Sequence, residues 1–179
     1  MKTLYKLLFL IAVSCVSGCA TDQEVLSGSE EKNPLISSSY AAADRLLTPA
    51  AKQELLGKDK RVLVASWVDV NQVSRTSIFG KLMAEQLASR LVQQGVAVME
   101  VKLRSSIYIT EKGGEMLLSR EIKEISKQHS AEAVIVGTYA DAGTSGVYVT
   151  VKLVRAVDGL VMSATNFMVD RKLVESIIK

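Results

Sequence analysis

The amino-acid sequence predicts one mixed α/β domain over residues 34–179, with a β-α-β-α-β core and a carboxy-terminal antiparallel hairpin. Three apolar runs of strand length alternate with segments that have the 3.6-residue period of a helix. The last third of the chain alternates apolar and polar residues, as half-exposed antiparallel strands do. The length suits a single domain, because domains commonly hold about 100–150 residues.

Two short helices are expected at the start of the domain. Pro34 marks its first residue, and the serines at positions 37–39 can cap a helix over residues 40–47. Pro49 interrupts this helix because proline removes a backbone donor, and it suits the first turn of a second helix over residues 50–56.

The first core strand is expected over residues 61–68, because this run is apolar on both faces of a two-residue period. A long helix follows, capped by Ser74 or Thr76 and ended after Gln94 by Gly95 in a left-handed conformation. Small residues recur every four positions along this helix and are expected to bring it close to the sheet. These residues are Gly80, Ala84 and Ala88.

Two more core strands are predicted over residues 95–101 and 133–139, with a helix over residues 117–129 between them. That helix carries an apolar stripe of Leu118, Ile122 and Ile125. Gly113 and Gly114 can form a tight turn before it. Trp67 alternates inward with Leu63 and Ala65, so we expect it in the core.

The end of the chain is predicted to form a hairpin and a closing helix. Residues 147–154 alternate between apolar and polar side chains. Asp158-Gly159 is a strong hairpin signal, and residues 160–167 form the returning strand. Residues 171–179 are expected to form a short helix.

No constellation of residues points to catalysis or to a metal. His129 is the single histidine, and its place near a predicted helix end favours a surface or capping role. The sequence has no G-x-S-x-G elbow and no glycine-rich phosphate motif. Glu100, Glu111 and Glu115 are spread along a strand and a loop rather than paired. We therefore expect no enzyme, no metal site and no cofactor beyond a covalent lipid.

Residues 1–18 have the composition of a secretory signal peptide. Two lysines precede a short apolar stretch, which is shorter than the roughly 20 residues needed to span a bilayer. Ser17 and Gly18 stand directly before Cys19 and look like a bacterial lipobox. We therefore expect cleavage after Gly18 and a lipid on the Cys19 thiol. An ordinary signal peptide that leaves Cys19 unmodified is the alternative.

The anchor implies a place in the cell envelope. Residues 19–33 are polar, so we expect a flexible tether between the lipid and the domain. Several acyl chains make attachment effectively permanent. Ala20 stands where inner-membrane lipoproteins carry aspartate, which favours the outer membrane, with the domain facing the periplasm. Cys15 leaves with the signal peptide, so no disulfide is expected in the mature chain.

The mature chain is expected to be close to neutral. The formal charge of +3 falls to +1 when Lys2 and Lys6 leave with the signal peptide. Nucleic-acid-binding proteins need a clustered basic surface, so the composition argues against a nucleic-acid partner. The lipid supplies the membrane contact instead.

Several stretches of the chain resemble the FlgO family of flagellar outer-membrane lipoproteins. The most specific is the long helix followed by G-G-E-x-x-L-S-R-E, and Val70 replaces a leucine that is frequent in the family. The matching stretches are residues 40–46, 64–71, 79–91, 113–121 and 136–139. The resemblance implies an outer-membrane lipoprotein needed for motility, which works with other proteins of the flagellar basal body and outer-membrane rings. It also implies a fold similar to the amino-terminal domain of TolB and to the α/β domain of CsgG and LpoB, without catalytic residues.

Three classes of function stay open at this point. The first is a structural module for flagellar assembly or stability. The second is an accessory lipoprotein of another envelope machine, such as a secretion pore or a cell-wall synthase. The third is an enzyme that acts on peptidoglycan or a small periplasmic ligand.

For partner contact, Arg104, residues 115–121 and the edge of the final hairpin are candidates, and a solvated helix face is the simpler interpretation of residues 115–121. The sequence allows an oligomer, which in a ring would need a head-to-tail interface that closes.

Overall fold

The computed structural model describes residues 33–55, 60–101, 109–112, 115–118 and 120–178. The chain separates into two compact units, Met1–Asn33 and Pro34–Lys179, and the fold below is that of the second unit. The expected signal peptide over residues 1–18, and all but the last residue of the expected tether over residues 19–33, lie outside the described residues.

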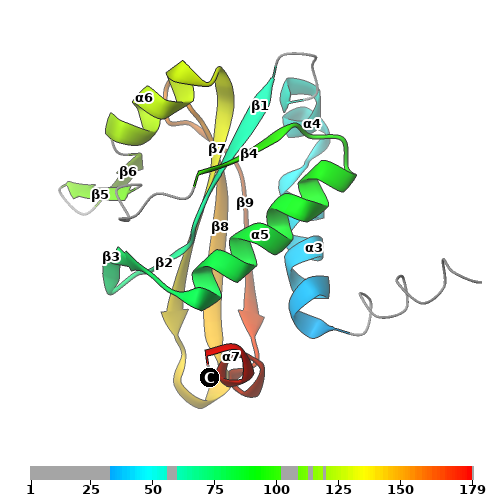
Figure 1. Cartoon of the computed structure of the whole chain (residues 1–179), viewed down its shortest axis with the longest axis vertical. Helices are drawn as coiled ribbons and strands as arrows, with labels where there is room; N and C mark the ends of the chain where they lie inside the picture. The colour runs from blue at the N-terminus through cyan, green and yellow to red at the C-terminus, as the bar shows by residue number, and fades with distance from the viewer. Residues whose placement is uncertain (1–32, 56–59, 102–108, 113–114, 119, 179) are drawn as a thin grey trace, which may run out of the picture. The chain divides into compact units, whose positions relative to one another are not determined.

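A seven-stranded mixed sheet forms the centre of this unit (Figure 1). Its longest strand, β7 (Ala131–Asp141), pairs in parallel with β1 (Arg61–Ala65) and β2 (Val68–Asp69) along one side. Along its other side β7 pairs antiparallel with β8 (Val147–Arg155). β7 is therefore covered by neighbours on both edges, which agrees with the central apolar strand predicted over residues 133–139.

The remaining strands extend the sheet on both sides. β4 (Val98–Val101) lies parallel to β1, and β3 (Gln72–Thr76) lies antiparallel to β2. β9 (Val161–Val169) lies antiparallel to β8 and completes the hairpin. The parallel strands, their helical connections and the final antiparallel hairpin confirm the predicted α/β class.

One face of the sheet is covered by α3 (Pro34–Leu46) and α5 (Ile78–Gln93), with contributions from α4 (Pro49–Leu55) and α7 (Arg171–Ile178) (Figure 1). The largest side chains between this helical layer and the sheet are fully buried. They are Trp67, Phe79, Leu46, Leu55, Met83, Leu87, Leu91, Ile135 and Leu153. Trp67 is 0% exposed, which confirms its predicted place in the core. The predicted alternation with Leu63 and Ala65 is wrong, because β1 ends at Ala65 and those two residues belong to a separate cluster on the other face of the sheet.

The opposite face is covered over one end by α6 (Arg120–Gln128). A smaller cluster lies beneath it and includes Leu63, Ala65, Val134 and Val154. Alternate residues of β1 and β7 thus enter different clusters, because successive side chains of a strand point to opposite faces.

The small residues of α5 bring the helix against the sheet, as predicted. Gly80 is buried, and a Cβ at this position would lie 2.1 Å from the carbonyl oxygen of Trp67. The backbone N–H of Trp67 donates to the Gly80 carbonyl oxygen at 3.2 Å. Gly95 has φ 84°, which confirms the left-handed conformation expected after the helix.

The start of α5 differs from the prediction. The N-cap is Ser77, whose Oγ accepts from the Gly80 N–H at 2.9 Å, whereas Ser74 and Thr76 lie in β3. The strand predicted over residues 61–68 is also interrupted, because the Trp67 N–H bonds to α5 rather than to a neighbouring strand.

The first helix is longer than predicted. α3 begins at Pro34 rather than at residue 40, so the serines at positions 37–39 lie inside it. Ser39 is buried and donates to the Leu35 carbonyl oxygen at 2.9 Å, which satisfies its hydroxyl within the helix.

The helix predicted over residues 117–129 is wrong at its start. β5 (Ile109–Lys112) and β6 (Glu115–Leu118) form a separate two-stranded antiparallel sheet, and α6 begins only at Arg120. Leu118 therefore belongs to a strand and not to the helical stripe. A short apolar run fits both the 3.6-residue period of a helix and the two-residue period of a strand, which explains the error. The turn expected at Gly113 and Gly114 lies outside the described residues.

The carboxy-terminal hairpin and helix were predicted well. The turn between β8 and β9 contains Asp158 and Gly159, and Gly159 has φ 80°. The Asp158 Oδ1 accepts from the Leu160 N–H at 3.0 Å, which is the local bond expected of aspartate in a turn. α7 follows over Arg171–Ile178.

Candidate functional site

The structure leaves most of the predicted site residues undescribed. Gly18, Cys19 and Arg104 lie outside the described residues, as does Ser119 within the predicted contact stretch 115–121. The backbone of that stretch is divided between β6 and the first turn of α6. His129 is exposed, and its carbonyl oxygen accepts from the Arg61 guanidinium at 3.3 Å, in agreement with a surface role.

A pocket of about 530 Å³ lies beside α6 and the turn between β8 and β9. Its charged lining comes from Lys60, just before β1, and from Lys123 and Lys127 of α6, together with Glu132 of β7. We call this the lysine pocket. Ala131, Ala156 and Val157 supply its apolar wall.

The helical period explains the α6 side of the lysine pocket. Ser126 and Lys127 lie three and four residues after Lys123, which places these three side chains on one face of α6. Ser130 also lines the pocket and lies just beyond the end of the helix. Ile125 packs instead against the cluster beneath α6. Ser130 has φ 52°, so the chain leaves the helix here and enters β7.

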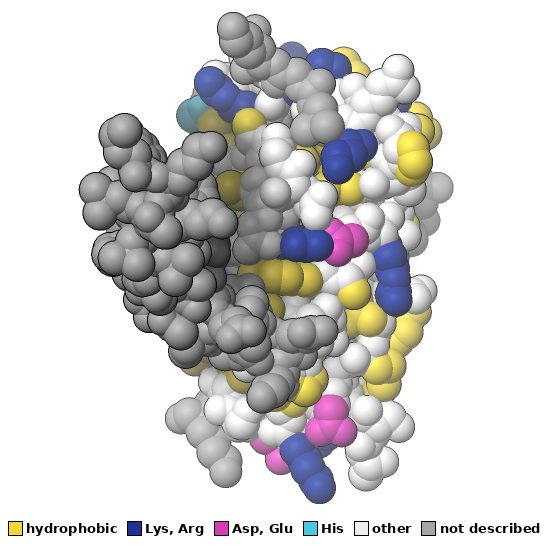
Figure 2. All heavy atoms as spheres, turned by 90° about the vertical axis from the view of Figure 1, so that its right-hand side faces the viewer, with side chains coloured by type: hydrophobic (Ala, Val, Ile, Leu, Met, Phe, Trp, Pro, Cys, Tyr) yellow, Lys and Arg dark blue, Asp and Glu magenta, His cyan; other side chains and the backbone are white. Residues whose placement is uncertain are grey.

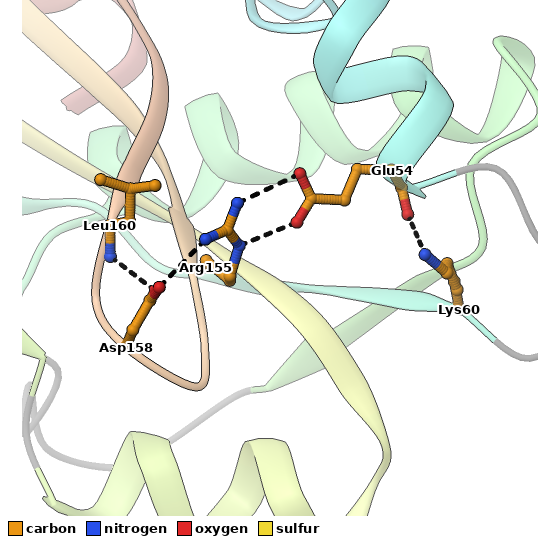
Figure 3. Close-up of polar contacts among 5 residues, drawn as sticks. All are labelled: Glu54, Lys60, Arg155, Asp158 and Leu160. Atoms are coloured by element: carbon orange, nitrogen blue, oxygen red, sulfur yellow. Dashed lines mark hydrogen bonds and ion pairs between the residues drawn. The ribbon is translucent and has the colours of Figure 1, made fainter.

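A polar network holds Lys60, one of the lining residues, in place (Figure 3). The Arg155 guanidinium donates to both carboxylate oxygens of Glu54, at 2.8 and 3.3 Å, and to Asp158 at 3.0 Å. The Lys60 ammonium donates to the Glu54 carbonyl oxygen at 2.6 Å. The Ala156 N–H donates to the Glu132 carbonyl oxygen at 2.9 Å. These bonds hold α4, the start of β1 and the β8–β9 turn together.

The same network shifts two pKa values. The hydrogen bond that Arg155 donates to Glu54 is the main cause that raises the pKa of the guanidinium above its ordinary value, and the hydrogen bond to Asp158 raises it further. The hydrogen bond from the Leu160 N–H is the main cause that lowers the pKa of the Asp158 carboxyl, and the hydrogen bond from Arg155 lowers it further. Both shifts favour the charged forms of these two groups, Arg155 and Asp158.

One polar group in the lysine pocket lacks a partner. Ser126 is 2% exposed, and its Oγ has no hydrogen bond to any residue that the structure describes. Leaving a buried hydroxyl unsatisfied costs about 1–3 kcal/mol. Lys123 and Lys127 are exposed, and neither forms a hydrogen bond or ion pair with another described residue. The pocket thus offers two ammonium groups and one hydroxyl to a ligand.

Sequence reasoning missed the lysine pocket. The spacing of Lys123, Ser126 and Lys127 was visible, but helix faces rich in lysine are usually solvated. Only the tertiary structure shows that Lys60 and the β8–β9 turn meet this face.

A second surface lies on the part of the sheet that α6 does not cover. Tyr148 and Met168 are register partners on β8 and β9, and they are 42% and 44% exposed. The next outward-facing pairs are Thr150 with Asn166 and Lys152 with Ala164. Among the described strands β9 pairs only with β8, so it forms the sheet edge predicted for the final hairpin.

Charges are mixed on the face shown in Figure 2. Lys and Arg side chains are spread over its height and alternate with hydrophobic and acidic side chains. Within the described segments, no three His, Cys, Asp or Glu side chains gather as a metal site would require. No helix among the described residues has the length and apolar character needed to cross a membrane.

Several solved structures are similar to this chain. The carboxy-terminal domain of LpoB from Escherichia coli superposes with a TM-score of 0.52 at 12% identity, covering 78% of this chain and all of that domain. The PelC dodecamer subunit from Paraburkholderia phytofirmans gives a TM-score of 0.41 at 21% identity, over 63% of this chain and 72% of PelC. Lipoprotein GNA1162 from Neisseria meningitidis gives a TM-score of 0.41 at 17% identity, over 62% of this chain and 80% of that lipoprotein. The likeness to LpoB confirms the architecture.

Sequence comparison gives the family. A search of curated proteins returned no match. The family model described as FlgO protein matches residues 40–174, which include the lysine pocket, the smaller core cluster and every buried residue of the larger cluster except Leu35. The resemblance noted from the sequence is thereby confirmed, and the chain belongs to the FlgO family.

Proposed function

We propose that this protein is a lipid-anchored, non-catalytic accessory protein of the outer membrane that contributes to flagellar assembly or stability and therefore to motility. The family match over residues 40–174 carries this proposal. FlgO membership fits an accessory lipoprotein of the cell envelope, and the fold shared with LpoB agrees with such a role.

The anchor explains how a domain without catalytic machinery can act. Cleavage after Gly18 and acylation of Cys19 would fix the new amino terminus in the membrane. The polar stretch that follows would span about 20 Å as a flexible coil, which keeps the domain close to the lipid headgroups. The domain then works by presenting a surface at a fixed place.

The uncovered part of the sheet is the surface best suited to a protein partner. Tyr148 and Met168 expose apolar area side by side, and aromatic residues and methionine are enriched in interfaces. β9 adds a sheet edge, to which an extended segment of another protein can pair. We propose that other outer-membrane or basal-body proteins of the flagellum dock here.

A deletion strain tests the flagellar role. We expect reduced swimming in the deletion strain, restored by the wild-type gene and by Cys15→Ser, which changes a cysteine inside the signal peptide. Cys19→Ser should fail to restore it, because this cysteine carries the lipid. Normal swimming of the deletion strain, with normal flagellar number and unchanged basal-body rings, would contradict the proposal.

A crosslinking pull-down from intact cells separates the flagellar role from the second candidate. Recovery of flagellar proteins supports the proposal. Recovery of a secretin or a cell-wall synthase, with no flagellar protein, would favour an accessory lipoprotein of another envelope machine. Substituting Tyr148 and Met168 by serine should reduce recovery, while the double change of Lys81 and Lys172 to glutamine on exposed helix surfaces should leave it unchanged.

A further inference from the structure

We propose that the lysine pocket binds the free carboxylate of a peptide whose last residue has a small apolar side chain. This site is separate from the sheet surface assigned to flagellar partners, and it does not depend on the flagellar role. Charged side chains, a hydroxyl without a partner among the described residues, and apolar side chains all line this one pocket.

The charges favour an anion. Three lysines and one glutamate line the pocket, so like charges lie in a common concave space. Lys60 is already held by the Glu54 carbonyl oxygen, whereas Lys123 and Lys127 have no hydrogen bond or ion pair within the described part of the chain. A ligand carboxylate would accept from these two ammonium groups and relieve their mutual repulsion.

The Ser126 hydroxyl supplies a further donor. It belongs to the same helical face as the two lysines, and its Oγ is buried without a partner among the described residues. A serine hydroxyl can donate to a carboxylate oxygen, and a buried polar group without a partner favours a ligand that satisfies it.

The position on α6 favours a carboxylate over a phosphate. Lys127 lies in the last turn of α6, where the helix dipole is negative, while phosphates prefer helix amino termini with their unpaired N–H groups. The carboxylate of Glu132 would also repel a doubly charged group. A single negative charge matches this environment better.

The apolar part of the pocket lining selects the kind of residue that carries the carboxylate. Ala131, Ala156 and Val157 are small and apolar, and they suit a methyl or isopropyl side chain beside the charged group. Glu132 offers an acceptor for the amide N–H of the same terminal residue. Such a terminus occurs on proteins, with L-residues, and on cell-wall stem peptides, with D-residues.

The test is a titration of the full-length protein, purified in detergent, with N-acetyl-L-alanyl-L-alanine and its D,D isomer. Heat of binding or amide chemical shifts give the affinity. We expect saturable binding in the millimolar range, with no binding of the carboxy-terminal amide of the same dipeptide. Preference for the L,L form supports a protein terminus as the source, and preference for the D,D form supports a cell-wall peptide.

Variants assign the binding to the lysine pocket. The double variant Lys123→Gln/Lys127→Gln should bind about tenfold more weakly, a change of about 1.4 kcal/mol. The control Lys81→Gln/Lys172→Gln, which removes two exposed lysines elsewhere, should bind like the wild type. Ser126→Ala should weaken binding without lowering the melting temperature. Equal binding of the dipeptide amide, equal binding of inorganic phosphate, unchanged affinity in the pocket double variant, or no binding of either dipeptide would overturn the proposal.

Discussion

Substitution of Gly137 by alanine tests how α5, Trp67 and the central strand fit together. A Cβ at Gly137 would lie 2.3 Å from Cγ of Trp67 and 2.4 Å from Cδ1 and Cδ2. Carbon atoms in contact are normally about 3.5–4.0 Å apart, so three ring atoms would be overlapped by more than about 1 Å. Either the ring or β7 must move.

The surroundings of Trp67 make movement difficult. The residue is fully buried, and its ring packs edge-to-face on Phe167 with 6.4 Å between the ring centroids. Its backbone N–H donates to the Gly80 carbonyl oxygen. Overpacking of a core costs about 1–3 kcal/mol, and we expect a value near 3 kcal/mol here. For a protein of this size each kcal/mol lowers the melting temperature by about 2–4 °C, so the expected loss is about 6–12 °C.

Thermal and urea unfolding, followed by circular dichroism, measure this loss. Gly143→Ala is the matched control, because no atom lies within 4 Å of its Cβ and only its φ of 65° disfavours alanine. The control should cost about 1–2 kcal/mol. In the double variant Trp67→Ala/Gly137→Ala the methyl group enters the space left by the indole, so the two losses should not add. A Gly137→Ala protein as stable as the wild type, or strictly additive losses, would refute the reasoning.

Three further predictions follow from single side chains. Ser126→Ala removes a buried hydroxyl that has no partner among the described residues, so in the absence of ligand it should raise the free energy of unfolding by about 1 kcal/mol. A lower free energy of unfolding, measured with urea, would contradict this. Ser77→Ala removes the N-cap of α5 and should cost about 1 kcal/mol, whereas Ser89→Ala on the exposed side of the same helix should cost less. Asp158 has a pKa below its ordinary 3.8, so its stabilising contribution is present above pH 3.8 and is lost as the pH falls further. Melting curves between pH 7 and pH 2 should therefore show a smaller acid loss for Asp158→Asn, and an equal loss would count against the network.

The elements predicted best are those with a strong local signal. The alternation along β8 needs no knowledge of a partner, and Asp158 with Gly159 fixes the turn through a local bond and a positive φ. Gly95 likewise ends α5 because its left-handed conformation suits glycine. Local chemistry alone decides these features.

The elements predicted badly depend on distant contacts. β3 pairs with a strand of only two residues, Val68–Asp69, so nothing in its own sequence distinguishes it from a helix start. The break after β1 exists because the Trp67 backbone bonds to α5, a contact between segments apart in the chain. β6 required knowledge of its partner β5.

The candidate site divides in the same way. The spacing of Lys123, Ser126 and Lys127 could be read from the sequence, since it follows the helical period. The approach of Lys60 and of the β8–β9 turn could not, because it depends on the sheet order and on the ion pairs of Arg155. A pocket needs several walls, and the sequence shows only one of them.

The most direct test of the account is the mass of the amino-terminal peptide of the native protein, isolated from the membrane fraction. We predict a peptide that begins at Cys19 and carries a diacylglyceryl group and a further acyl chain. A chain that begins at another residue, or an unmodified Cys19 thiol on protein that washes off membranes in buffer, would contradict the claim that this domain acts by being held at the membrane.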